Sequence, residues 1–136
     1  MLLDRKECPS WEYILATGTT TLTETWRGLQ DPDEGVSMNR FALGTVVGWM
    51  FAYPGGIRYE KSAPGFTHSV LQPCPIREIG SFGTEYRSAS GRISVGWAFA
   101  DGHTAVYTFE TGQNVTLLLP DGSTREFPAG EHRVRL

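Results

Sequence analysis

Apolar and polar positions follow two different periods along this chain. Between residues 39 and 53 the apolar residues recur at helical spacing: Phe41, Leu43, Val46, Val47, Met50 and Phe51. Pro54 ends the run, because proline lacks an N–H and its ring clashes with the preceding turn. The pattern therefore predicts a mostly buried helix from Asn39 to Tyr53.

A shorter helix is predicted near the N-terminus, from Trp11 to Ala16. Ser10 precedes it and has the side-chain oxygen that caps a helix N-terminus. The sequence Thr17-Gly18-Thr19 ends the helix. Glu24 is then expected on an extended or loop segment.

Beyond Ile57 the dominant period is two. Ile93, Val95, Trp97 and Phe99 alternate with polar or small residues, and the same alternation recurs from Ala105 to Phe109. Side chains of a strand point to opposite faces in turn, so this pattern predicts strands with one buried face.

Two Asp-Gly pairs separate the predicted strands. Asp101-Gly102 lies between the two just named, and Asp121-Gly122 lies between residues 115–119 and 125–127. Each pair is a hairpin signal because glycine tolerates positive φ. Short strands joined in this way predict an antiparallel β-sandwich.

The change of period divides the chain at Pro54-Gly55-Gly56. We expect two parts, residues 1–57, which are helical, and residues 58–136, which form the sandwich. The predicted fold class is α+β, mainly β. A small sandwich buries limited apolar surface alone, so the helix from Asn39 to Tyr53 is expected to pack against it.

Composition narrows the class of protein. With 136 residues, 40% hydrophobic and 20% charged, the chain is expected to be globular, as one domain or one small domain with an appendage. A net charge of -3 with scattered basic residues argues against nucleic-acid binding. No apolar run approaches the roughly 20 residues of a membrane span, and charges stand where a signal peptide would need an apolar core. We expect a cytoplasmic protein whose Cys8 and Cys74 are free thiols and not a disulfide.

Candidate chemistry centres on Glu24, in the stretch Thr19-Thr20-Thr21-Leu22-Thr23-Glu24-Thr25-Trp26. A carboxylate beside a flat aromatic ring and several hydroxyls suits a sugar-cleaving site. From local sequence alone, a surface carboxylate is the alternative. The expected sugar platforms are Trp11 and Trp26, whereas Trp49 and Trp97 lie on apolar stripes and are expected in the core. The three histidines have no metal-ligand spacing, so no metal or cofactor is expected.

Several motifs together resemble one family, and they span nearly the whole chain. They are Pro9-Ser10-Trp11-Glu12-Tyr13, the Glu24 stretch, Asn39-Arg40-Phe41-Ala42-Leu43-Gly44, Gly55-Gly56-Ile57, Pro64-Gly65-Phe66, Ser90-Gly91-Arg92-Ile93-Ser94 with Trp97, and Leu119-Pro120-Asp121-Gly122. The chain resembles the C-terminal end of the α-L-rhamnosidases of glycoside hydrolase family 78. The resemblance implies the last part of an (α/α)6 barrel followed by a β-sandwich, and an inverting cleavage in which Glu24 matches the general base.

Arg40 departs from the family pattern, which usually has histidine there as a substrate-site residue. Arginine cannot give up its proton near neutral pH, so a switchable acid or acceptor is lost at that point. Arg40 is then either a structural partner of Glu24 in a catalytic remnant, or a substrate-binding residue of altered specificity.

The resemblance and the length together predict function. A complete helical barrel takes several hundred residues in this family, so the second carboxyl group of an inverting pair is expected to be missing. We expect a C-terminal rhamnosidase fragment, inactive alone, which a complementary rhamnosidase chain would complete. A noncatalytic carbohydrate-binding module is the alternative, with a rhamnoside or another carbohydrate as ligand. An assembly domain is a further one.

Overall fold

The computed structural model describes residues 5–33 and 35–136. The chain forms two compact units, Met1–Val47 and Gly48–Leu136, and each is described by itself. The first unit contains helix α1 (Trp11–Ala16) and two 3-10 turns, Gly28–Gln30 and Ala42–Thr45. Helix α2 (Val46–Ala52) begins at the division between the units.

Helix α1 has the bounds and the cap that the sequence predicted. The Ser10 side-chain oxygen accepts a hydrogen bond from the backbone N–H of Tyr13 at 2.9 Å. This bond satisfies one of the N–H groups that a helix N-terminus leaves without a partner. At the other end, the backbone N–H of Thr17 bonds carbonyls of the last turn. The predicted cap is confirmed.

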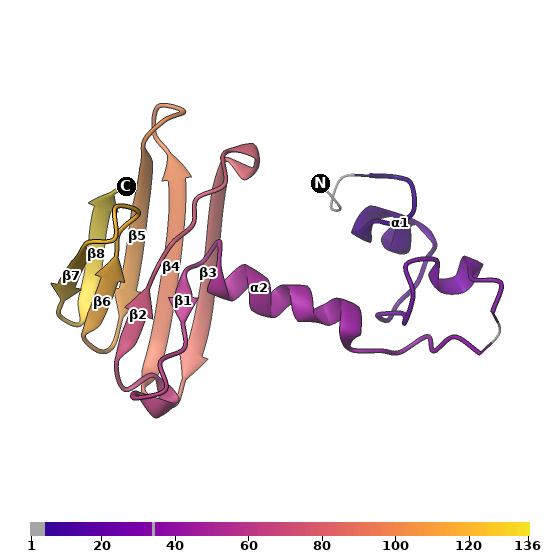
Figure 1. Ribbon diagram of the computed structural model, residues 1–136, viewed down its shortest axis with the longest axis horizontal. Coiled ribbons are helices and arrows are strands. Elements are labelled where there is room, and N and C mark those ends of the chain that lie inside the picture. Colours follow the sequence, from indigo (N-terminus) through magenta and orange to yellow (C-terminus); the bar gives the residue numbers. More distant parts are fainter. Residues whose placement is uncertain (1–4, 34) are drawn as a thin grey trace. The chain divides into compact units, whose positions relative to one another are not determined.

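The second unit consists of two four-stranded sheets within the described residues (Figure 1). The first sheet has the order β1 (Ile57–Arg58), β2 (Ser69–Leu71), β6 (Val115–Leu118) and β7 (Thr124–Phe127). The second has the order β3 (Ser81–Ser88), β4 (Gly91–Phe99), β5 (Ala105–Thr111) and β8 (Gly130–Arg135). Two 3-10 turns, Pro64–Phe66 and Arg77–Ile79, lie in the connections.

The hydrophobic core of the second unit draws its residues from both sheets. Its buried members are Ile57, Leu71, Ile93, Val95, Trp97, Tyr107, Phe109, Val115, Leu117, Leu119 and Val134. Alternate residues of β4 and β5 point into it, as the period of two predicted. Both Asp-Gly pairs join antiparallel neighbours, β4 to β5 and β6 to β7. The mainly β class and the sandwich are therefore confirmed.

One pairing differs from the antiparallel expectation. Strand β2 pairs with β6 in parallel, with Ser69 opposite Val115 and Leu71 opposite Leu117. The other strand pairs among the described residues are antiparallel. Parallel neighbours need a long crossover connection, and here the strands β3, β4 and β5 lie between them in the sequence.

The predicted helix from Asn39 to Tyr53 is shorter than expected and is not mostly buried. Helix α2 starts at Val46, and none of its residues is buried. Trp49, expected in the core, is 46% exposed, whereas Trp97 is 3% exposed and is a core residue as predicted. The reason is that apolar residues occupy more than one face of α2, while the core accepts one of them, Phe51.

The turn after α2 is fixed to the second sheet by two buried hydrogen bonds. Nε1 of Trp97 donates to the Pro54 carbonyl at 2.6 Å, and the Tyr107 hydroxyl donates to the Gly55 carbonyl at 3.1 Å. Burial raises the pKa of the Tyr107 hydroxyl, so it remains a donor. These bonds satisfy two carbonyls that would otherwise be buried without partners.

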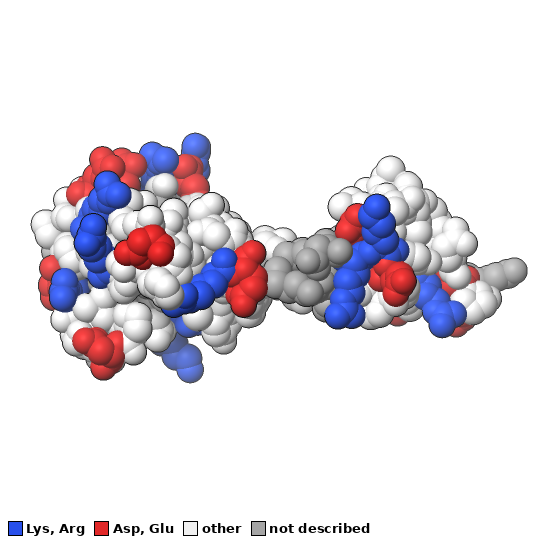
Figure 2. Space-filling view, turned by 90° about the horizontal axis from the view of Figure 1, so that it is seen from above, with Lys and Arg blue, Asp and Glu red and all other residues white. Residues whose placement is uncertain are grey.

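Basic and acidic side chains are interspersed on the face that Figure 2 presents. In the second unit, Arg92 forms ion pairs with Glu85 at 2.7 Å and with Glu110 at 3.2 Å. Among the described residues, no helix has the length and apolar character needed to cross a membrane.

Candidate active site

Glu24 lies in the first unit on a bend without regular secondary structure, as the sequence predicted. Threonines on either side of it hold this bend. The hydroxyl of the fully buried Thr23 donates to the Thr25 carbonyl at 2.8 Å, and the Thr25 hydroxyl donates to Oδ2 of Asp31 at 2.6 Å. These two threonines therefore support the loop.

Asp31 completes the support of this loop. Its Oδ1 accepts the backbone N–H of Asp33 at 3.1 Å, while its Oδ2 accepts the Thr25 hydroxyl. The Thr25 hydroxyl, and then the Asp33 N–H, lower the pKa of Asp31 below its usual value of 3.8, because they bond the ionised form. The loop that carries Glu24 is thus held by a charged carboxylate at neutral pH.

Both carboxylate oxygens of Glu24 have a donor from residues 37–40. Nη2 of Arg40 lies 3.0 Å from Oε1 of Glu24, and the backbone N–H of Ser37 donates to Oε2 at 3.0 Å. The backbone N–H of Glu24 in turn donates to the Ser37 carbonyl at 2.9 Å. The Glu24 side chain is 33% exposed and remains open to solvent.

These two donors position the Glu24 carboxylate and leave some of its lone pairs free to accept further hydrogen bonds. An ionised carboxylate has about four lone-pair sites, and the two donors occupy two of them. The others can bind a water molecule and accept its proton. The pairing with Arg40, one of the two roles that the sequence left open, is confirmed as a contact. The role of Ser37 was not foreseen, because it acts through its backbone N–H.

The two indoles predicted as sugar platforms pack on each other. The ring centroids of Trp11 and Trp26 lie 4.9 Å apart at an interplanar angle of 72°, an edge-to-face pair. Both side chains are partly exposed. The four predicted site residues therefore fall into two contacting pairs, Glu24 with Arg40 and Trp11 with Trp26.

A pocket of about 260 Å³ lies beside Trp11 in the same unit. Its other lining residues are Ile14, Leu15, Thr19, Thr20, Thr21 and Leu22. One indole and three threonines give it both apolar and hydroxyl-bearing walls. Glu24, Trp26 and Arg40 do not line it, so the pocket and the carboxylate are separate features of the unit.

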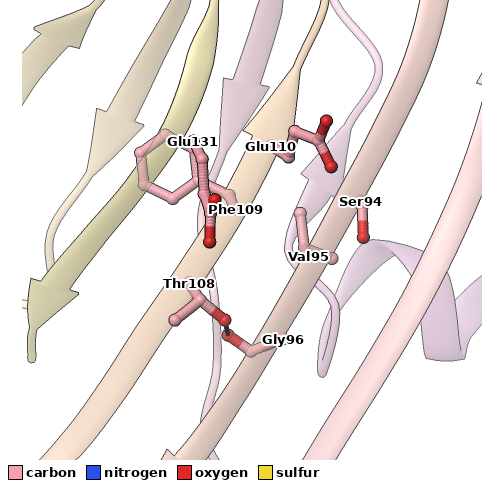
Figure 3. Close-up of a pocket in the computed structure, with 7 residues that line it drawn as sticks. All are labelled: Ser94, Val95, Gly96, Thr108, Phe109, Glu110 and Glu131. Atoms are coloured by element: carbon pink, nitrogen blue, oxygen red, sulfur yellow. Dashed lines mark hydrogen bonds between the residues drawn. The ribbon is translucent and has the colours of Figure 1, made fainter.

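The outer face of the second sheet has a different hollow, of about 240 Å³, at β4, β5 and β8 (Figure 3). Gly96 lines it, and the Thr108 hydroxyl donates to the Gly96 carbonyl at 3.3 Å. Glu110 and Glu131 stand opposite each other in register. Phe109 points into the core and is 2% exposed, so the hollow has no aromatic platform for a sugar.

Metal ligands do not gather in the part of the chain that the structure describes. No group of three or more His, Cys, Asp or Glu side chains there is arranged to hold a metal ion. Cys8 and Cys74 are exposed free thiols.

Family models match both parts of the sequence. Residues 1–53 match the bacterial alpha-L-rhamnosidase 6 hairpin glycosidase domain, and residues 56–133 match the bacterial alpha-L-rhamnosidase C-terminal domain. An alpha-L-rhamnosidase of Streptomyces avermitilis is 34% identical over an alignment of 102 residues that covers 71% of this chain and 10% of that protein. Another, from Alteromonas sp., is 26% identical over an alignment of 136 positions that covers 96% of this chain and 14% of that protein.

Solved structures agree with these matches. The crystal structure of the Aspergillus terreus enzyme shares the fold with a TM-score of 0.84 at 24% identity, covering 98% of this chain and 16% of that one. The Streptomyces avermitilis α-L-rhamnosidase complexed with L-rhamnose has a TM-score of 0.78 at 28% identity, covering 99% and 15%. This chain thus spans about a tenth to a sixth of the length of these relatives. Because the C-terminal domain model matches more than half of the sequence, the chain belongs to the bacterial α-L-rhamnosidase family.

Proposed function

We propose that this chain is the C-terminal part of an inverting α-L-rhamnosidase-like glycoside hydrolase, and that Glu24 is its general base. One observation carries the proposal: two donors, Arg40 and the Ser37 N–H, fix the Glu24 carboxylate and leave it partly exposed. In this reading residues 1–57 are the end of the helical barrel and residues 58–136 are the sandwich.

In the complete enzyme, Glu24 removes a proton from the water that attacks the anomeric carbon. Arg40 and Ser37 hold the carboxylate in place as the proton moves to it. Trp11 and Trp26 shape the sugar site through their exposed ring surface. The substrate is a rhamnoside, by analogy with the relatives named α-L-rhamnosidase.

Residues 1–136 alone are proposed not to turn over substrate. Inversion needs a second carboxyl group, the general acid, roughly 6.5–9.5 Å from the base. The rest of a barrel, in a longer chain or in a complementary rhamnosidase chain, would supply it. Exposed apolar side chains support such a partner, because Leu15 is 75% and Phe41 82% exposed in the first unit.

A chimera tests the role of Glu24. This chain would replace the matching segment of the Streptomyces avermitilis enzyme, and cleavage of an aryl α-L-rhamnoside would be measured. Glu24→Gln is expected to lower kcat by about 10²–10⁴-fold, the usual contribution of a general base. Glu12→Gln, at an acidic residue of α1, is the matched control and is expected to leave kcat within twofold. An active chimera that tolerates Glu24→Gln contradicts the proposal.

Arg40 is tested in the same chimera. If Arg40 belongs to a catalytic remnant, Arg40→His does not raise activity toward the rhamnoside, and a rise contradicts that interpretation. If it sets an altered specificity, the arginine form cleaves a different aryl glycoside, and Arg40→His abolishes that activity. The isolated chain is assayed in parallel, and turnover that depends on Glu24 there contradicts its proposed inactivity.

A carbohydrate-binding module is the second candidate, and the pocket beside Trp11 favours it. An indole with three threonine side chains provides an apolar face and hydroxyls for one sugar ring. The test is an amide NMR titration with L-rhamnose, with D-glucose as control. Shifts at Thr19 to Thr21 that Trp11→Ala abolishes support binding. A spectrum unmoved at high millimolar rhamnose contradicts it.

A cytoplasmic location is also part of the proposal. Its support is the pair of exposed free thiols, Cys8 and Cys74, which a reducing compartment maintains. Fractionation of the native host, followed by thiol labelling, tests it, and recovery of the protein outside the cytoplasm contradicts it.

A further inference from the structure

A pocket of about 460 Å³ lies at the first sheet of the second unit, and of its lining residues Leu119 also belongs to the core. Arg58 and Leu118 follow the core residues Ile57 and Leu117 in their strands, and side chains alternate between faces. Other walls come from Gln72 to Pro75 and from the turn between β6 and β7. Three prolines and two leucines make most of this lining apolar.

Arg58 is the charged group of the pocket, and the protein provides it with no acidic partner among the described residues. Its guanidinium carbon lies 4.4 Å above the Tyr53 ring. Its Nε is shielded from water and has no hydrogen-bond partner. Arg40, Arg87 and Arg92, in contrast, each have a glutamate within 4.0 Å.

One face of the guanidinium lies over Tyr53, and its terminal Nη groups remain available at the edge that does not include the shielded Nε. The N–H donors of arginine lie in the plane of the group, where they match the two oxygens of a carboxylate. Nε of Arg58 is shielded, so an anion in the pocket would pair with the two terminal Nη groups, which have no hydrogen-bond acceptor among the described residues.

The wall formed by residues 72–75 is held by backbone hydrogen bonds. The backbone N–H of Gln72 donates to the Gly56 carbonyl at 2.7 Å, and that of Cys74 donates to the Tyr53 carbonyl at 3.2 Å. These bonds tie the wall to the same turn that carries Tyr53. A ligand in this pocket would not have to order that segment, which would favour affinity.

We propose that this pocket binds a small monocarboxylate that carries a single ring. The carboxylate pairs with the edge of Arg58, the ring packs on the proline and leucine walls, and the Gln72 amide bonds a remaining polar group. The volume lies within the range of small-molecule sites and suits one ring. Two sources share this chemistry, a sugar acid and an aromatic acid.

The experiment is an amide NMR titration of the full chain with two matched pairs, D-glucuronate against D-glucose and benzoate against benzyl alcohol. Shifts are read at Gln72, Cys74 and Gly122, which line the pocket. We expect one carboxylate to shift them and its neutral partner not to, and the responding acid identifies the source. If neither acid moves them more than its neutral partner, the proposal is overturned.

Arg58→Met keeps the apolar stem on Tyr53 and removes the charge. It is expected to weaken binding of the responding acid at least about tenfold, since a hydrogen bond to a charged group contributes about 1.5–3 kcal/mol. Arg58→Lys keeps the charge without the planar fork, so an intermediate affinity is expected. Affinity unchanged by Arg58→Met overturns the proposal.

Arg77→Met is the matched control. Arg77 also lies over an aromatic ring, 5.7 Å from that of Phe99, but it is outside the pocket and Nη1 donates to the Gly102 carbonyl. Equal losses of affinity in both methionine variants would mean nonspecific charge attraction and overturn the proposal.

A second experiment leaves Arg58 unchanged and uses the exposed Cys74 in a Cys8→Ser chain. The bound acid is expected to slow its alkylation by iodoacetamide, and an unchanged rate at saturating acid counts against the site.

Discussion

Arg40 and Glu24 form an ion pair across 3.0 Å, and the Ser37 N–H holds the other oxygen of the same carboxylate. Fifteen residues lie between the two partners in the sequence. The backbone brings them together, because the N–H of Arg40 donates to the Leu22 carbonyl at 2.7 Å and that of Glu24 to Ser37. The pair therefore rests on two segments that run side by side.

This pair is predicted to contribute little to stability. The side chains are 52% and 33% exposed, and exposed ion pairs contribute about 0–1 kcal/mol. In a double-mutant cycle with Arg40→Met and Glu24→Gln, measured by urea denaturation, the coupling free energy should stay below about 1 kcal/mol. A coupling above about 2 kcal/mol would assign the pair a structural role and weaken its assignment to a site.

The hydroxyl of Tyr107 is predicted to stabilise the second unit. Tyr107→Phe removes the donor to the buried Gly55 carbonyl and should lower the free energy of unfolding by about 1–3 kcal/mol. Tyr86→Phe, at a tyrosine that is 39% exposed, is the control and should change it by less than about 0.5 kcal/mol. Equal effects in the two variants would contradict the assignment.

Two glycines with nearly the same φ are predicted to differ sharply in tolerance. Gly56 has φ +76°, and a Cβ there would lie 2.4 Å from the Pro73 nitrogen. Gly102 has φ +75° with nothing within 4 Å. Gly102→Ala should therefore cost about 1–2 kcal/mol from backbone strain alone. Gly56→Ala should cost more than that, or prevent folding, because backbone atoms must also move. Thermal melting of both variants checks this difference.

Two truncations are predicted to show that the end of α2 and the turn after it stabilise the sandwich. A chain of residues 48–136 retains Phe51 and the carbonyls of Pro54 and Gly55, and its melting temperature should match that of the second unit in the full chain. A chain of residues 58–136 loses all three and should melt lower and bind a hydrophobic dye. An undiminished melting temperature of the shorter chain would show that α2 and its turn do not support the sandwich.

Acid is predicted to destabilise the second unit. Hydrogen bonds from Arg92 and then Arg87 lower the pKa of Glu85 below its usual 4.5, and the N–H groups of Thr104 and then His103 lower that of Asp101 below 3.8. A lowered folded-state pKa means that the stabilisation is present above the unfolded pKa and is lost as pH falls through the folded one. The urea concentration at the unfolding midpoint should therefore decrease as the pH is lowered below about 4.5.

Glu85→Gln tests the acid prediction directly. It should lower the midpoint at pH 7 and flatten the acid decline, because the group that titrates is gone. Glu131→Gln is the control, since Glu131 has no ion-pair partner among the described residues. An acid decline that is unchanged in Glu85→Gln contradicts the role of that carboxylate.

Elements that are determined by neighbouring residues could be predicted from the sequence. Ser10 caps α1 through its own side chain, and the Asp-Gly pairs at 101 and 121 form their turns regardless of distant residues. The period of two also placed Trp97 in the core. These features follow from neighbouring residues, so a pattern can predict them.

Features that depend on distant segments could not be read in this way. Periodicity shows which residues of α2 are apolar but not which are covered, so Trp49 was wrongly expected in the core. Ser37 supports Glu24 through an N–H that every residue but proline has. The pocket at Arg58 forms where residues 72–75 and 118–122 meet, and its existence depends on the parallel pairing of β2 and β6.

That parallel pair also bears on the order in which the sandwich assembles. Strands β3, β4 and β5 pair with strands that are adjacent in the sequence. The pairing of Ser69 with Val115, in contrast, joins strands that have β3, β4 and β5 between them in the chain. Closing a long loop costs entropy before any contact offsets it, so non-local pairs form slowly. We expect pulsed hydrogen exchange to show β4 and β5 protected first. The pocket of Arg58 would then be among the last features of the molecule to form.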